Sequence, residues 1–454
     1  MMCAMFIILV AFASVKMAFD SVPLALFSRA SGLIGTEYTP FNEKGERQCS
    51  RVRTENNFIF GKTYANHEIA IYFPEKELDV FTHQPVYSSA FFVSHQDIRD
   101  DTIREFDGIR FIGKSLNKVF EKKGLVVKYE EDGDKFIHND DGIIYDITTK
   151  DFTFRFTVRS IVNYQGGTEG NGLSNNKVIC ELEFEQKQPL NEFFLHFNNM
   201  RNIISFLTNR LDVGFEEIYL LKYNERIHFR TELAKVYIVD KSEITKRDDY
   251  NILSFNDLGD SLPELIGLFY NPKERKPHCS LGFYPKNDGD IYLMTSDKIR
   301  AICSGLECEL AFAKDIQTEN NQYLNNLTAQ TKELIKSFRN ENPDTISDNT
   351  YSMIFSSLSH WSNSLAERIF CLYKKFFVEI NILNREIGVR LGEEEIKAFV
   401  KYRNDITHGN HRVLDRRIAY TAHLLSGLVY CSLLDRIGVS REKICELCEH
   451  KLLR

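Results

Sequence analysis

Residues 393–409 read EEEIKAFVKYRNDITHG, and this stretch decides the fold class of the region around it. Its apolar residues recur at the three- and four-residue spacings of an amphipathic helix. They are Ile396, Phe399 and Val400. Arg403 follows Ile396 by seven residues and therefore falls on the same stripe. Gly409 is a natural C-cap, which predicts that the helix ends at His408.

Helical periodicity continues on both sides of this stretch. The predicted helices are 297–340 as one helix or two, 347–384, 393–408, 415–436 and a last amphipathic helix capped by Ser440. The connections between them are short, so the helices are predicted to pack antiparallel as a bundle.

Upstream of about residue 270 the pattern is that of strands. Short runs rich in β-branched and aromatic residues occupy 58–60, 67–72 and 90–93, and apolar and polar residues alternate over 151–158 and 178–184. Two helical stretches, 113–123 and 190–208, interrupt them. This part of the chain is therefore predicted to be mixed and mostly β.

The stretch 271–290 is rich in Pro, Gly and charge and predicts a linker or an exposed loop. The expected fold class is α+β with two domains, a mostly-β N-terminal domain over 21–285 and an all-α helical bundle over 290–454. Residues 1–20 begin with an apolar run that is too short to span a bilayer. A misassigned start or a core strand is the favoured interpretation of that run, and a secretory signal is the alternative.

The composition limits the classes of function. The 454 residues are 43% hydrophobic and 27% charged, which is typical of a soluble protein of two globular domains. A net charge of −7 excludes a generally basic nucleic-acid coat, although an RNA enzyme needs only a local basic site. The ten scattered cysteines suit reduced thiols in the cytoplasm. Cys445 and Cys448 have no second ligand pair, so neither a metal nor another cofactor is expected.

Arg403 and His408 together suit RNA cleavage. An imidazole can accept the proton of an attacking 2′-hydroxyl, and a planar guanidinium matches the charge that develops on the phosphate oxygens. The spacing alone is weak evidence, because Arg417 and His423 show a similar one. On spacing alone, a structural salt bridge together with a histidine at the helix C-terminus is the favoured interpretation.

Four sequence segments carry a family resemblance. YRNDITHG resembles the signature of HEPN ribonuclease domains, and SGLECELAF, with Glu307, resembles their first helix. Upstream, FDGIRFIGKSLNKVF and KVICELEFEQKQPLNEFFLHFNNMRNIISFLTNR resemble the N-terminal domain of the ApeA anti-phage family. In that family a β-rich domain precedes a HEPN domain.

The resemblance implies a metal-independent endoribonuclease of abortive infection, with its site at a homodimer interface of the helical domain. Arg403 would stabilise the phosphate, His408 would act as base or acid, and Asn404 would position them. Glu367 is a weaker candidate for a supporting carboxylate, since an exposed ion pair suits it better. The basic residues expected to track the RNA backbone are Lys397, Lys401, His411 and Arg412.

The N-terminal domain would sense a phage-derived or cellular trigger, and no membrane is expected as a partner. The alternative function is a non-catalytic HEPN-like module that binds RNA or a partner protein. A purely structural dimerisation domain is a third possibility.

Overall fold

The computed structural model describes residues 50–53, 55–62, 67–73, 77–80, 90–94, 103–120, 126–129, 135–138, 142–165, 172–238, 252–270, 281–291, 293–313, 316, 321–342, 347–359, 364–385, 388, 391–410 and 413–452. They form two compact units that interleave along the chain. The first, here called the β unit, comprises Met1–Ile204, Asp212–Thr245 and Ser254–Asn256. The second, the helical unit, comprises Ser205–Leu211, Lys246–Leu253 and Asp257–Arg454. The apolar run at residues 1–20 lies outside the described residues.

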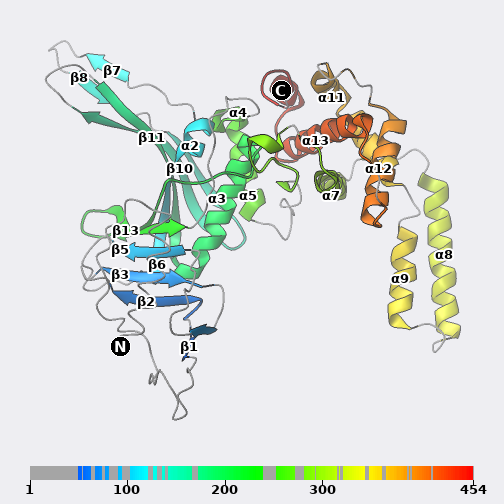
Figure 1. Ribbon diagram of the computed structural model, residues 1–454, viewed down its shortest axis with the longest axis horizontal. Coiled ribbons are helices and arrows are strands. Elements are labelled where there is room, and N and C mark those ends of the chain that lie inside the picture. Colours follow the sequence, from blue (N-terminus) through cyan, green and yellow to red (C-terminus); the bar gives the residue numbers. More distant parts are fainter. Residues whose placement is uncertain are drawn as a thin grey trace. The chain divides into compact units, whose positions relative to one another are not determined.

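An antiparallel nine-stranded sheet dominates the β unit (Figure 1). Its order is β2-β3-β5-β13-β12-β6-β11-β10-β9. The strands are β2 (Phe58–Lys62), β3 (Glu68–Tyr72), β5 (Ala90–Ser94), β6 (Glu105–Ile112), β9 (Ile143–Thr148), β10 (Thr153–Gln165), β11 (Gly172–Pro189), β12 (Glu217–Asn224) and β13 (Phe229–Ile238). Two further antiparallel pairs join β1 (Ser50–Arg53) to β4 (Glu77–Val80) and β7 (Val126–Tyr129) to β8 (Lys135–His138).

One face of the sheet is apolar and is covered by α3 (Phe193–Thr208) (Figure 1). On β10 the alternation places Phe154, Phe156 and Val158 on this face, where all three are buried. Phe193 of α3 meets Phe92 edge to face, with ring centroids 5.1 Å apart. The predicted alternating strand therefore forms because one of its faces is buried. Three short elements complete the unit's local structure. They are α2 (Lys114–Val119), η1 (Leu190–Glu192) and the start of α4 (Phe255–Leu258).

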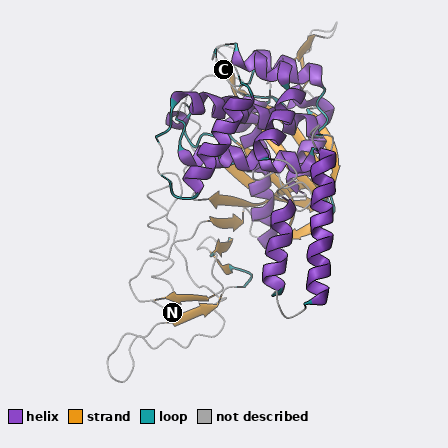
Figure 2. Ribbon diagram, turned by 90° about the vertical axis from the view of Figure 1, so that its right-hand side faces the viewer, coloured by secondary structure: helices purple, strands orange, loops and turns teal. Residues whose placement is uncertain are grey.

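The helical unit is built from helices alone, apart from short 3-10 turns (Figure 2), in the part of the chain that the structure describes. They are η2 (Gly259–Ser261), α5 (Leu262–Tyr270), η4 (Asp288–Asp290), α7 (Ser296–Phe312), α8 (Asn321–Glu341), α9 (Asp348–Ser359), α10 (Leu365–Lys375), α11 (Phe377–Asn384), α12 (Glu393–Thr407), α13 (Arg416–Arg436) and α14 (Arg441–His450). A β-rich part followed by a helical part confirms the predicted α+β class.

The caps explain which predicted helix boundaries hold. Asp415 accepts a hydrogen bond from the Ile418 amide at the start of α13, and Ser440 caps α14 in the same way. The segment 347–384 is three helices rather than one. Ser364 and Glu367 form a capping box that starts α10 afresh, and this local signal interrupts the apolar period.

The prediction of an exposed linker over 271–290 is wrong for residues 281–284 and holds for Lys286, Asn287 and Gly289, which are exposed. Leu281, Phe283 and Tyr284 are buried. The rings of Phe283 and Tyr284 meet edge to face at 4.9 Å, and Tyr284 lies 6.2 Å from the ring of Tyr430 on α13. The burial of these aromatic side chains therefore outweighs the polar composition of the segment. The first half, 271–280, lies outside the described residues.

The central helix α13 is long and apolar enough to cross a membrane by length and composition, and among the described helices it alone passes that test. In the structure 72% of its apolar window is buried inside the protein. It packs against α7, α11 and α12, so it has the character of a core helix of the helical unit.

Candidate functional site

The site begins with the end of α12, which is fixed by its backbone. The amide of Gly409 donates to the carbonyl of Ile406 at 3.4 Å, and the amide of Asn410 donates to that of Asp405 at 2.9 Å. Gly409 has a φ of 79°. These bonds form a Schellman cap, and they make His408 the C-cap residue, as predicted.

Arg403 lies one turn before this cap and is held from two sides. One terminal nitrogen of its guanidinium donates to Glu307 of α7 at 2.9 Å, and the other donates to Asn404 at 3.1 Å. The side chain of Arg403 is 25% exposed and that of Glu307 is 41% exposed. The guanidinium is therefore oriented by two partners and still reaches solvent.

A second guanidinium approaches the same helix end. Arg300 of α7 donates to the backbone carbonyl of Ile406 at 2.8 Å and pairs with Asp297 at 2.6 Å. A cation at this position interacts favourably with the negative end of the α12 dipole. Sequence reasoning missed Arg300. The sequence pattern that could have identified it is its spacing from Cys303 and Glu307, because the three residues fall on one face of α7.

The remaining predicted catalytic groups lie at the same end of α12. His408 and Asn404 are exposed. Cys303 lies between Arg300 and Glu307 along α7. Burial raises the pKa of its thiol to about 11, although the positive charge of Arg403 acts in the opposite direction. That thiol is neutral at physiological pH, so it is not a nucleophile there.

The residues predicted to track RNA have different surroundings. Lys397 pairs with Glu393 at 2.8 Å and with Glu394 at 3.2 Å, and these bonds raise the pKa of its ammonium. Lys401 is exposed on α12. His411 and Arg412 lie outside the described residues. Glu367 lies in the first turn of α10 and belongs to its capping box.

The competing pair, Arg417 and His423, lies on α13 in a different setting. Arg417 pairs with Glu395 on the surface. Burial lowers the pKa of His423, with a further contribution from Lys298. A histidine whose charged form is disfavoured in this way is a poor proton carrier near neutral pH.

Among the residues that the structure describes, no group of three or more His, Cys, Asp or Glu side chains could hold a metal ion. Cys431 and Cys448 are buried neighbours, with sulfur atoms 3.6 Å apart.

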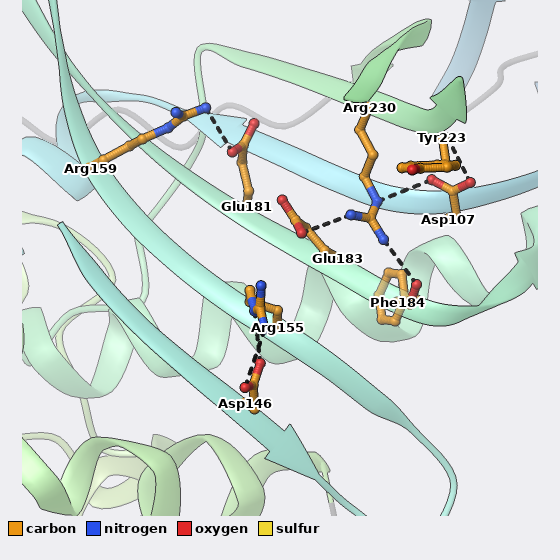
Figure 3. Close-up of polar contacts among 9 residues, drawn as sticks. All are labelled: Asp107, Asp146, Arg155, Arg159, Glu181, Glu183, Phe184, Tyr223 and Arg230. Carbon is orange, nitrogen blue, oxygen red and sulfur yellow. Dashed lines mark hydrogen bonds and ion pairs between the residues drawn. The ribbon is translucent and has the colours of Figure 1, made fainter. Parts of the chain in front are cut away.

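A second polar cluster occupies the face of the sheet opposite α3 (Figure 3). Arg230 pairs with Glu183 at 2.7 Å and with Asp107 at 3.3 Å. Arg159 and Arg110 share Glu181, at 3.1 Å and 2.6 Å. These cations are matched by carboxylates from neighbouring strands, which favours a structural role over binding of a further anion.

The comparisons with known proteins concern the first half of the chain. Residues 50–267 match the family model described as ApeA N-terminal domain 1. No curated protein and no solved structure shows a significant match to the chain. The matched region spans the whole sheet and ends within α5, so it does not reach α7 or α12.

Proposed function

The chain belongs to the ApeA-like anti-phage family through residues 50–267, and from this premise we propose that its helical unit is a HEPN-type endoribonuclease. In this proposal Arg403 and His408 cleave RNA without a metal, and the protein acts in the cytoplasm by abortive infection. The β unit senses a phage-derived or cellular trigger and restrains the nuclease.

One observation carries the proposal. The guanidinium of Arg403 is oriented by Glu307 and Asn404 while a quarter of the side chain stays exposed, and an exposed histidine follows five residues later at the helix cap. A hydrated, oriented guanidinium and an exposed imidazole at the same helix end suit a phosphodiester ligand.

The chemistry follows from these groups. The 2′-oxygen of the RNA attacks the adjacent phosphorus, a new O2′–P bond forms, and the P–O5′ bond breaks. The products are a 2′,3′-cyclic phosphate and a free 5′-hydroxyl. His408 takes the proton of the 2′-hydroxyl or returns one to the leaving 5′-oxygen. Arg403 stabilises the charge on the equatorial oxygens, and Asn404 helps to orient it.

A base and an acid are both needed in this reaction, whereas one chain supplies one His408. We therefore propose that two chains pair, so that two Arg–His sets serve one cleft. Lys401 and Lys397, with His411 and Arg412, would then line the approach of the RNA backbone.

The test uses the purified full chain, total RNA, and reactions with and without EDTA. We expect cleavage that survives EDTA and falls about 100-fold or more in Arg403→Ala and in His408→Ala. Arg417→Ala is the matched control, because it removes an exposed arginine of the competing motif on α13, and it keeps wild-type cleavage. Folding of each variant is checked by circular dichroism.

Retained cleavage in both the Arg403 and His408 variants would overturn the assignment. A shifted RNA band in a gel-shift assay, without cleavage products, would instead support the alternative function, a non-catalytic module that binds RNA. Cleavage that disappears with EDTA would contradict the metal-independent mechanism.

A further inference from the structure

Strand β9 forms one edge of the nine-stranded sheet and, among the described strands, pairs only with β10. The hairpin between the two strands fixes the direction of its main-chain groups, because the amide of Thr149 donates to the carbonyl of Phe152 at 2.8 Å. Counted from this bond, the alternation of an antiparallel ladder turns the N–H and C=O groups of Ile144, Asp146 and Thr148 away from β10. β9 therefore presents a row of main-chain donors and acceptors on its outer side.

These three residues are accessible to solvent. Ile144 is 52% exposed, the side chain of Asp146 is 70% exposed, and Thr148 is exposed as well. No described residue donates to or accepts from their outward main-chain groups. Such a row of outward groups is a binding surface for an extended strand of another chain.

The sequence of β9 does not protect this edge. Edge strands are commonly guarded by lysine, by proline or by a bulge. β9 reads IIYDIT, contains neither lysine nor proline, and keeps a continuous register with β10. Its isoleucine, tyrosine and threonine residues are strong strand formers.

The opposite edge of the sheet differs in this respect. Phe58 of β2 also turns its main-chain groups outward, since the amide of Phe73 donates to the carbonyl of Asn57 at 2.8 Å in the ladder beside it. There the chain folds back, and Glu55 exchanges two hydrogen bonds of 2.9 Å with Phe58. β2 also ends in a glycine and a lysine, which disfavour a further strand.

The charges around β9 indicate the chemistry of the strand that fits beside it. Glu181 of β11 lies between two arginines, Arg159 on β10 and Arg110 on β6. Within the described residues Asp146 has an arginine on one side only, Arg155 of β10 at 2.8 Å (Figure 3). A cation from a strand on the outer side of β9 would complete the same arrangement.

The apolar face of the sheet is also incompletely covered at this edge. Ile147 is buried, whereas Ile143 and Tyr145 are half-buried. Apolar side chains of an added strand would pack against these two residues and extend the core of the β unit.

We propose that the outer edge of β9 binds an extended segment of a protein partner, which pairs antiparallel with β9 as the neighbouring strands of the sheet do. A lysine or arginine of that segment lies opposite Asp146, and apolar residues lie opposite Ile144 and Tyr145. A second copy of β9 fits less well, because a two-fold axis at Asp146 places like charges opposite each other. The inference rests on the proposed function only in making this partner the trigger. Binding at this edge stands whether or not the helical unit cleaves RNA.

The first experiment uses a fluorescein-labelled peptide, Thr-Val-Lys-Val-Val-Val between glycine-serine extensions, whose lysine lies opposite Asp146 when it pairs. We expect saturable binding to the purified full chain by fluorescence anisotropy. The same peptide with a methyl group on the backbone nitrogen of its lysine should bind at least tenfold more weakly, because it lacks that main-chain donor. Hydrogen exchange followed by mass spectrometry should show protection over residues 143–148 when the first peptide is bound.

The second experiment changes the edge itself. Ile144→Pro removes an outward N–H that makes no bond to β10, so the sheet tolerates it, and we expect at least tenfold weaker binding. Ile144→Thr is the matched control. It keeps the N–H and a β-branched side chain, so the affinity should stay within about threefold of the wild type. Asp146→Lys should weaken binding of the lysine peptide and favour the peptide with glutamate in its place.

The absence of saturable binding up to about 1 mM peptide would overturn the proposal. Equal binding by Ile144→Pro and the wild type, or by the methylated and unmethylated peptides, would do the same. A wild-type dimer that Ile144→Pro dissociates would identify a second copy as the occupant instead. Circular dichroism establishes that each variant is folded. The peptide is titrated without RNA, so failure of the proposed nuclease leaves this result unchanged.

Discussion

Glu307 and Glu309 lie two residues apart on α7, and the first forms an exposed ion pair whereas the second forms a buried one. Glu309 is 1% exposed, pairs with Arg436 of α13 at 3.0 Å and accepts a hydrogen bond from Ser432. Glu307 is 41% exposed and pairs with Arg403 of α12 at 2.9 Å. The buried pair is fixed in the core of the helical unit. The exposed pair is worth about 0–1 kcal/mol, so Arg403 can exchange this partner for a phosphate at little cost.

The β unit holds ion pairs with buried carboxylates, like that of Glu309. On the polar face of its sheet, Glu181 is buried and receives two arginines, and Arg230 is held by Asp107 and Glu183 (Figure 3). Paired cations at such positions hold strands together. The side chains of Arg159 and Arg230 are 36% and 22% exposed, close to the 25% of Arg403. The exposed fraction of the carboxylate, 41% for Glu307 against 6% for Glu181, is therefore what separates the two kinds of pair.

The largest expected effect is the loss of the buried pair. Glu309→Ala leaves the guanidinium of Arg436 without its carboxylate in a site where it is only 14% exposed. We expect the free energy of unfolding of the helical unit to fall by about 3–5 kcal/mol. Urea unfolding followed by circular dichroism measures this change. A loss below about 1 kcal/mol would mean that the two α7 pairs do not differ.

The second prediction uses a histidine of the β unit. Burial lowers the pKa of His196 to about 3. Its ring lies 4.3 Å from that of Phe184 and 5.0 Å from that of Phe152. Above pH 6.5 neither the folded nor the unfolded state binds the proton. As the pH falls from 6.5 towards 3, only the unfolded state binds it, so the stability of the β unit falls.

Between pH 6.5 and pH 4.5 this histidine is expected to remove about 2–3 kcal/mol of stability. Urea unfolding at both pH values measures the loss, and His196→Leu serves as the comparison because it has no proton to bind. The variant should lose correspondingly less stability over the same interval. Equal losses in the variant and the wild type would show that other groups cause the acid sensitivity.

Local signals explain what the sequence predicted. The ends of α12, α13 and α14 followed from Gly409, Asp415 and Ser440, because a cap acts within one turn of its helix. The strand at 151–158 followed from alternation, because one face of β10 is buried. Both signals are contained in short windows of sequence, and the fold class depends on no more than these.

The missing parts depend on contacts between distant residues. The position of β6 between β12 and β11 has no local signal. Glu307 meets Arg403 across 96 residues, and Arg300 reaches the carbonyl of Ile406 across 106. Only the packing of α7 against α12 creates these contacts. The sequence could therefore nominate Arg403 and His408, whereas the partners that orient the guanidinium required the structure.

The third prediction concerns the helix cap that carries His408. Gly409 has a φ of 79°, which is unfavourable for a residue with a β-carbon, and no atom lies within 4 Å of the position that a β-carbon would take. Gly409→Ala therefore adds backbone strain without a steric clash, and we expect a loss of about 1 kcal/mol. Gly388→Ala is the control at another glycine of positive φ, with φ 67°. Both variants should lose similar stability, whereas cleavage should fall only in Gly409→Ala, which displaces His408.

The smallest expected effect on stability belongs to the exposed pair itself, and it is the closest test of the comparison. Glu307→Gln keeps an oxygen that accepts the hydrogen bond from Arg403 but removes one negative charge. We expect the free energy of unfolding to change by less than about 1 kcal/mol, since the pair is well hydrated. The KM for RNA should fall, because a phosphate then approaches Arg403 without a neighbouring carboxylate, while kcat stays close to the wild-type value. A loss of stability as large as that of Glu309→Ala would show that Arg403 is a structural cation like Arg436, and the case for a phosphate at this end of α12 would fall with it.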